Sequence, residues 1–357
     1  MTIAARTLGG TSQEGINGFT TPSRMNKSSA FAQMYSVKTG KGSTAGITVA
    51  VGTNAASTAT YSYSTNGGNS WSTPVAMDSG LVFSTMRNLA VNTSGLMVAV
   101  GSGSGNAAMY STSSYGTSSW SVPAFMNGST SYALMEGITV NSSGLFVAVG
   151  YDSTNAPMFA SSSNGNTWTT PARMNGSSVA APMYSIAVNS SGLFVAVGNN
   201  GFGAPVYSNS IDGNTWTTPA LMNGSSTAAL LRGIAVNSSG LFVAVGSDNT
   251  GAGVYATSSN GSTWTTPTRI NGSAIGAYMQ DIAVNSSGIF VAVGYGSTNA
   301  PMFASSTDGS TWTTPALMNN SSTVAYIFGV SVNSSKLFSA VGWDNSNAPL
   351  SSSAFFT

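Results

Sequence analysis

Few side chains in this sequence could do chemistry, because the chain contains no cysteine and no histidine. Thiolate and imidazole metal sites, cysteine nucleophiles and triads with a histidine base are therefore excluded. Arginine, tyrosine and carboxylate groups remain. One set of such groups follows a position that is usually methionine and recurs about every 48 residues: Tyr35, Arg87, Glu136, Tyr184, Arg232, Gln280 and Phe328.

This first set has the chemistry of a binding site more than of a catalytic one. Two arginines could bind a carboxylate, and the tyrosines and Gln280 could exchange hydrogen bonds with a polar ligand. Glycoside hydrolysis needs two carboxyl groups at a controlled spacing, and Glu136 is the one carboxylate in this set. Asp281 lies outside the set, directly after Gln280. An equally good interpretation is that the set fills a central channel, with arginine balanced against glutamate.

A second set opens the loop after each Val-Gly pair and consists of Thr53, Ser102, Tyr151, Asn199, Ser247, Tyr295 and Trp343. We expect Tyr151, Tyr295 and Trp343 to present exposed aromatic faces beside the carboxylates of Asp152 and Asp344. Sugar binding commonly combines an aromatic platform with amide or carboxylate hydrogen bonds, so Asn155, Asn299 and Asn347 belong to the same hypothesis. The alternative is that these aromatic side chains pack onto the neighbouring repeat.

The elements that position both sets are repeats. Val-Ala-Val-Gly begins at residues 49, 98, 147, 195, 243 and 291, and Ser-Ala-Val-Gly at 339, so the steps are 48 or 49 residues. Such periods, with short apolar runs and Gly, Asn and Ser turns, are typical of β-propeller blades. We predict an all-β fold, a seven-bladed β-propeller of four-stranded blades. A second marker, an aromatic residue three positions before proline, also occurs seven times, at Phe19, Trp71, Trp120, Trp168, Trp216, Trp264 and Trp312.

The repeat from Met183 to Met222 shows how four strands fit one blade. Residues 183–189, 193–198 and 204–210 are predicted as the first three strands, with a tight Asn-Ser-Ser-Gly hairpin turn at 189–192. Residues 215–222 are predicted as the fourth strand. It is the outer edge, where the amide that Pro219 lacks costs least.

The ends of the chain predict how the ring closes. The last repeat stops after its third strand, whereas the first begins with a fourth-strand sequence from Phe19 to Met25. The N-terminal strand should therefore complete the last blade and hide its edge. We expect a single propeller over residues 16–357, preceded by an arm at 1–15 that is disordered or docks to a partner.

The turn before each tryptophan resembles the Asp-box (BNR) repeat of sialidase-like propellers, whose pattern is Ser-x-Asp-x-Gly-x-Thr-Trp. The matching segments include 64–71, 210–216 and 306–312, of which the last two are one residue shorter than the pattern. The resemblance covers nearly the whole chain and implies the fold. It also implies that the box residues satisfy turn amides while the tryptophan packs between sheets.

Catalytic members of that family need an arginine cluster, a tyrosine nucleophile and an acid. Arg24, Arg173 and Arg269 share a repeat position near the end of the outermost strand, far from a central pocket. We expect them to be solvated edge charges and the protein to be a non-catalytic member.

Composition limits the function further. Only 5% of residues are charged and the formal net charge is +1, so nucleic acid is not an expected partner. We expect no membrane insertion, no secretory signal, no metal and no cofactor. A shell rich in Ser, Thr, Asn and Gly fits an extracellular or virion-surface protein.

We therefore expect a non-enzymatic recognition or adhesion propeller that binds carbohydrate, of the kind found in bacteriophage tails. Its partner would be a cell-surface glycan or neighbouring virion proteins, and a homo-oligomer is compatible with the sequence. One alternative is a purely structural virion or surface-layer protein that uses the propeller faces for protein contacts. A sialidase-like glycoside hydrolase is the other.

Overall fold

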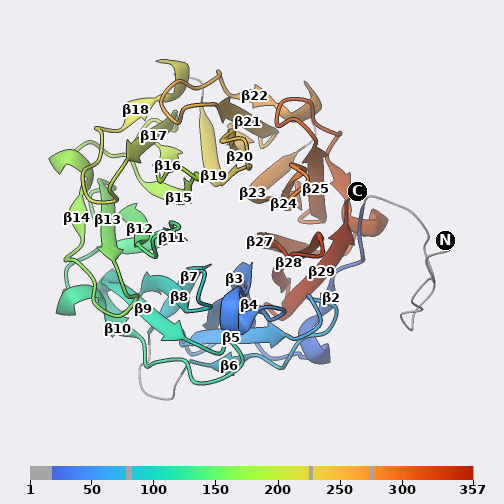
Figure 1. Ribbon diagram of the computed structural model, residues 1–357. Coiled ribbons are helices and arrows are strands. Elements are labelled where there is room, and N and C mark those ends of the chain that lie inside the picture. The colour runs from blue at the N-terminus through green and yellow to red at the C-terminus, as the bar shows by residue number, and fades with distance from the viewer. Residues whose placement is uncertain (1–17, 78–82, 225–227, 273–275, 357) are drawn as a thin grey trace.

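The protein is a ring of seven antiparallel β-sheets (Figure 1), described by a computed structural model over residues 18–77, 83–224, 228–272 and 276–356. Each sheet is one blade, and consecutive blades follow one another around the ring. The predicted seven-bladed, four-stranded architecture is confirmed. The expected arm at residues 1–15 lies outside the described residues.

Two strands of each blade lie toward the ring axis. The innermost strands are β3 (Ala32–Thr39), β7 (Thr85–Val91), β11 (Leu134–Val140), β15 (Met183–Val188), β19 (Ala229–Val236), β23 (Ala277–Val284) and β27 (Ala325–Val332). The second strands are β4 (Thr48–Asn54), β8 (Met97–Ser102), β12 (Phe146–Tyr151), β16 (Phe194–Asn199), β20 (Phe242–Asp248), β24 (Phe290–Gly296) and β28 (Leu337–Asp344).

The outer half of each blade is a third strand and a very short fourth one. The third strands are β5 (Ala59–Ser64), β9 (Ala108–Ser113), β13 (Pro157–Ser162), β17 (Pro205–Ser210), β21 (Gly253–Ser258), β25 (Pro301–Ser306) and β29 (Pro349–Phe355). The fourth are β6 (Val75–Ala76), β10 (Ala124–Phe125), β14 (Ala172–Arg173), β18 (Ala220–Leu221), β22 (Thr268–Arg269) and β26 (Ala316–Leu317), with β1 (Gly18–Phe19) and β2 (Ser23–Arg24) in blade 7.

Short 3₁₀ turns complete the structure. Within the described residues, six of them follow an outer strand: η1 (Met25–Lys27), η4 (Met126–Gly128), η5 (Met174–Gly176), η6 (Met222–Gly224), η7 (Ile270–Gly272) and η8 (Met318–Asn320). Two others, η2 (Gly42–Thr44) and η3 (Ser104–Asn106), lie in loops of blades 1 and 2.

The predicted fourth strand at residues 215–222 is too long, since only Ala220 and Leu221 are paired in the ladder. Before them, Pro219 has no amide to donate. The Thr217 amide instead donates to the Asn209 carbonyl, and the Thr217 hydroxyl accepts a hydrogen bond from the Asn209 amide at 3.0 Å. A side-chain oxygen therefore replaces a strand carbonyl on this edge.

The core lies between neighbouring blades. The second strands are buried on both faces, which explains why they read as continuous apolar runs instead of alternating ones. Five of the tryptophans that precede an outer strand pack on an aromatic ring of the preceding blade, as Trp216 does on Phe159 at 6.0 Å. The turn before it also touches that blade: Gly213 adopts φ +75° and lies against Val147, where a Cβ would approach within 2.7 Å.

The predicted closure of blade 7 is confirmed. Phe19 pairs with Ala354 in the ladder and is 3% exposed, with its ring 5.5 Å from Phe303 and 5.9 Å from Phe356. The amide of Asn319 donates to the Thr21 hydroxyl at 2.8 Å, repeating a bond that other blade pairs form between the same turn and the next outer segment. The seam is thus built from the same contacts as the continuous part of the ring.

Candidate functional site

A β-bulge in every innermost strand positions the first set. The register shifts between Met34 and Ser36 in β3, and at the same place in β7, β11, β15, β19, β23 and β27. The skipped residue is in each case the member of the first set. Bulges redirect a side chain out of the regular alternation. Seven partly exposed side chains thereby form a ring at one end of the central channel, which we call the channel mouth.

Contacts between blades support this placement. The Arg87 guanidinium lies 4.5 Å from the centre of the Tyr35 ring, and that of Arg232 lies 4.2 Å from the Tyr184 ring. Such cation–π contacts hold an arginine in place without neutralising its charge. Among the described residues neither arginine forms an ion pair, and Nε of Arg87 is buried without a hydrogen-bond partner. Any balance between these arginines and Glu136 therefore does not come from a direct ion pair.

The aromatic residues of the second set do pack onto the neighbouring blade. Tyr151 contacts Tyr184 at 6.1 Å, and Tyr295 contacts Phe328 at 5.8 Å. Both tyrosines keep part of their surface exposed. Trp343 does not: it is 8% exposed and stacks on Phe328 with centroids 4.2 Å apart. The expectation that Trp343 presents an exposed face is wrong, because Phe328 and Tyr35 cover it.

Tyr295, Trp343 and the rings that contact them form an aromatic arc over blades 6, 7 and 1 of the mouth. Tyr295 is the link, since it contacts Tyr278 at 5.4 Å and Tyr326 at 5.3 Å as well as Phe328. Trp343 continues the arc to Tyr35 at 5.2 Å. The opposite side of the mouth, in blades 2, 3 and 5, holds the charged members of the first set. The mouth therefore combines an aromatic arc in blades 6, 7 and 1 with charged groups in blades 2, 3 and 5, and Tyr151 and Tyr184 add an aromatic pair in blades 3 and 4.

Four tyrosines of the mouth have raised pKa values, so their hydroxyls remain protonated at neutral pH. Burial raises the pKa of Tyr151 to about 12, helped by the charge of Glu136. Burial also raises the pKa values of Tyr35, Tyr184 and Tyr295, although a nearby arginine opposes the shift in each. A hydroxyl in this state donates and accepts hydrogen bonds but is a poor nucleophile.

Asp152 and Asp344 are bound to the loop and the outer strand of their own blades. Asp152 Oδ1 accepts the amides of Thr154 and Ala156, while its Oδ2 accepts the Arg173 guanidinium at 2.6 and 2.8 Å. Burial would raise the pKa of this carboxyl, but these bonds hold it below its usual value. Asp344 has the same bonds with Arg24. Both carboxylates thus fix the loop to the outer strand, which is a structural role that the sequence interpretation did not include.

One further expectation is corrected, and the three loop asparagines prove to have a structural function. Arg24, Arg173 and Arg269 lie on the outer strands and stay partly solvated, as expected, but each also pairs with an aspartate at 2.6–2.8 Å. The three loop asparagines have a turn function, since each adopts a positive φ that asparagine tolerates better than most residues. Their φ values are +61° for Asn155, +59° for Asn299 and +60° for Asn347.

Just beyond the bulge, the innermost strands approach one another most closely. A Cβ on Gly233 would lie 2.9 Å from Cα of Asp281 in the next blade, and one on Gly329 would lie 2.8 Å from Cα of Ser36. Asp281 accepts the backbone amides of Ile282 at 2.8 Å and of Val330 at 2.9 Å. Burial nevertheless raises its pKa. This carboxyl joins blades 6 and 7 beneath the mouth.

The sequence does contain a signal for the aspartate–arginine pairs, which is a correlated change at two repeat positions. Asp152 and Arg173 are 21 residues apart, as are Asp248 and Arg269. Where the arginine position holds Ala76 or Leu221, the aspartate position holds asparagine. Two positions that change together between repeats indicate contact.

Comparisons with known proteins identify the fold and no family. No protein-family model and no curated protein matches the chain. Its fold is similar to that of YCF48 bound to D1 peptide, with 15% identity, a TM-score of 0.65 and coverage of 96% of both chains. The BP39L lectin of Burkholderia pseudomallei is similar with 13% identity and a TM-score of 0.72, covering 91% of this chain and 97% of the lectin.

An enzyme also shares the fold. The GH74 xyloglucanase of Xanthomonas campestris has 11% identity and a TM-score of 0.57, covering 94% of this chain and 55% of the enzyme. Within the described residues, no helix is long and apolar enough to cross a membrane, and no three acidic side chains gather as they would around a metal ion.

Proposed function

We propose that this protein is a non-enzymatic recognition and adhesion propeller that binds carbohydrate at the channel mouth. The observation that supports this most is the combination of partly exposed aromatic rings with charged groups that have no ion-pair partner. Sugars present apolar C–H faces and hydroxyl groups together, so a surface that offers rings and hydrogen-bonding groups side by side is complementary to them.

The chemistry of the mouth favours binding over catalysis. Glu136 is the carboxylate among the seven bulge residues, and Asp281 is committed to two backbone amides. A retaining or inverting glycosidase needs a second carboxyl across the bond that breaks. A tyrosine nucleophile would need a lowered pKa, whereas Tyr35, Tyr151, Tyr184 and Tyr295 have raised ones.

The similar folds agree with a binding propeller, since one is named as a lectin and another is bound to a peptide. The turn bonds agree with the Asp-box resemblance: Asp212 accepts the amides of Asn214 and Thr215, and Trp216 lies in the adjacent interface. With 5% charged residues, we place the protein outside the cell or on a virion surface, as in a bacteriophage tail.

A second candidate is a structural protein that binds another protein. Blade 4 supports it, because an apolar patch replaces the aspartate–arginine pair of its neighbours. Phe202 is 94% exposed, Val179 62% and Leu221 38%, and the two loops meet where the amide of Gly201 donates to Ala180. Exposed apolar groups that lie together are typical of protein interfaces.

A glycan array tests the proposal. We expect the wild-type chain, displayed multivalently, to bind at least one glycan, and Tyr151→Ala with Tyr295→Ala to weaken that binding about tenfold through lost ring contacts. Tyr115→Ala is the matched control, because Tyr115 is 64% exposed in an outer turn. Wild-type protein that binds no glycan would refute the proposal. A protein partner lost on Phe202→Ser would then establish the structural candidate.

A further inference from the structure

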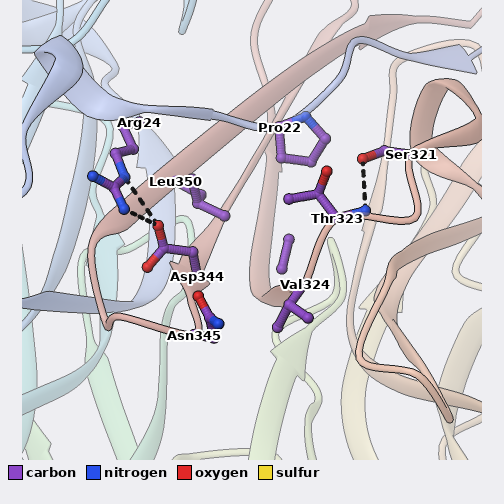
Figure 2. A pocket seen from close by; sticks show the side chains of 9 residues that line it. Pro22, Arg24, Ser321, Thr323, Val324, Asp344, Asn345 and Leu350 are labelled. Carbon is purple, nitrogen blue, oxygen red and sulfur yellow. Dashed lines mark hydrogen bonds and ion pairs between the residues drawn. The ribbon is translucent and has the colours of Figure 1, made fainter.

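A groove in blade 7, separate from the channel mouth, has the form of a small-molecule site (Figure 2). Its volume is about 420 Å³, within the range that small ligands occupy. Pro22, Val324 and Leu350 give it an apolar wall. Its polar side is formed by Arg24 and Asn345, on the opposite side of the groove from Pro22 in Figure 2.

The groove recurs at another blade, so it is a product of the repeat. In blade 1 a groove of about 370 Å³ is lined by Pro74 and Ala76 of the outer segment, by Asn54 of the loop after β4, and by Ala30 and Ala32. Each of these residues occupies the repeat position of a lining residue in blade 7. Ala76 stands where blade 7 has Arg24, so the same shape is lined by different chemistry.

The charge in the blade 7 groove is balanced, and its donors are only partly used. Arg24 donates from Nε and from one terminal nitrogen to Oδ2 of Asp344 at 2.9 and 2.7 Å, and the same terminal nitrogen donates to Ser346 at 2.9 Å. The Arg24 side chain stays 39% exposed. Five N–H groups are available on a guanidinium, so donors remain for a ligand.

Both carboxylate oxygens of Asp344 already accept hydrogen bonds, so they have little capacity left for a ligand. Its Oδ1 accepts the Ser346 amide and hydroxyl and the Ala348 amide, and its Oδ2 accepts Arg24. An ion pair of this kind attracts neither an anion nor a cation strongly, because the two charges cancel at a distance. The exposed side chains of Asn345 and Thr323 add neutral hydrogen-bonding groups. The groove thus suits an uncharged ligand with hydroxyl groups and an apolar face.

We propose that the blade 7 groove binds one neutral sugar residue, with its apolar face on Pro22, Val324 and Leu350 and its hydroxyls toward Arg24, Asn345 and Thr323. This site is additional to the channel mouth and rests on the proposed carbohydrate function. A sugar bound there would lie at the blade edge, away from the axis. One chain would then hold a central and a peripheral sugar at once, which raises avidity for a branched or clustered glycan.

The test is titration calorimetry of the full chain with the methyl glycosides of glucose, galactose, mannose and fucose. We expect at least one to bind wild-type protein. Val324→Trp should abolish that binding by filling the groove, and Asn345→Ala should weaken it roughly tenfold by removing a hydrogen bond. Ser322→Trp is the matched control, since this exposed neighbour does not line the groove. Thermal unfolding of each variant verifies its fold.

The outcomes separate this inference from the proposed function. Undiminished binding by a folded Val324→Trp variant overturns the groove site. Absence of glycoside binding beside a positive glycan array also overturns it and leaves the mouth standing. Binding that Val324→Trp removes, while Tyr151→Ala with Tyr295→Ala leaves it intact, supports the groove even where the mouth fails. Binding of a peptide instead of any sugar would overturn both.

Discussion

Replacing Phe19 by alanine should be among the most destabilising single changes in this protein. Phe19 is 3% exposed, lies in the strand that closes blade 7, and contacts Phe303 and Phe356 at 5.5 and 5.9 Å. Removing a buried phenylalanine costs about 3–5 kcal/mol in transfer and cavity terms. Since the whole fold is stabilised by about 5–15 kcal/mol, this is a large part of the total.

Urea unfolding followed by tryptophan fluorescence measures the effect. Phe355→Ala is the control from the same seam, because Phe355 is 53% exposed, and it should cost less than about 1 kcal/mol. If unfolding proves irreversible, the unfolding rate replaces the free energy, and Phe19→Ala should raise it far more than Phe355→Ala does. Equal effects of the two changes would show that the N-terminal strand does not hold the ring closed.

Two further predictions concern the scaffold. Hydrogen bonds from backbone amides of their own turns lower the pKa values of Asp212 and Asp308 from 3.8 to about 2. Because their folded-state pKa values are depressed, the stability that these carboxylates contribute is complete above pH 3.8 and is lost as the pH falls toward about 2. In urea titrations, the double variant Asp212→Asn, Asp308→Asn should therefore lose less free energy of unfolding over that pH window than wild type. Equal losses would contradict the assignment. Gly233→Ala should lower the free energy of unfolding by about 1–3 kcal/mol, because the new Cβ would lie 2.9 Å from Cα of Asp281. A shift in the urea midpoint worth less than about 0.5 kcal/mol would mean that the two strands can separate there.

The repeat made the fold predictable from sequence. The spacing of Val-Ala-Val-Gly gave the number of blades, and the fourth-strand sequence around Phe19 gave the closure, because both are periodic features that need no three-dimensional information. The short fourth strands were less predictable. Residues 215–222 have the composition of a strand, but Pro219 and the hydroxyl of Thr217 replace ladder bonds there.

The site was predictable in part. Variation among repeats identified the seven residues of the mouth, yet nothing local in the sequence indicates the bulges that position them, since a bulge is a mismatch between two strands. The exposure of Trp343 was mispredicted because Phe328 stacks on it. This contact requires an aromatic residue at both repeat positions of the same blade. Asp152 and Arg173 could have been paired from sequence, because the two positions change together between blades.

The scaffold is repeated while the chemistry is not, and this difference limits what ligand each proposed site could accept. At the mouth all seven blades meet, and their different side chains give one opening an aromatic arc in three blades and charged groups in three others. Such a surface is complementary to one unsymmetrical ligand at a time. The two grooves lie away from the axis, so blades 7 and 1 present separate versions, with Arg24 in blade 7 and Ala76 in blade 1. A glycan that engages both must therefore span from the axis to a blade edge, which favours extended or clustered sugars over isolated monosaccharides as the natural ligand.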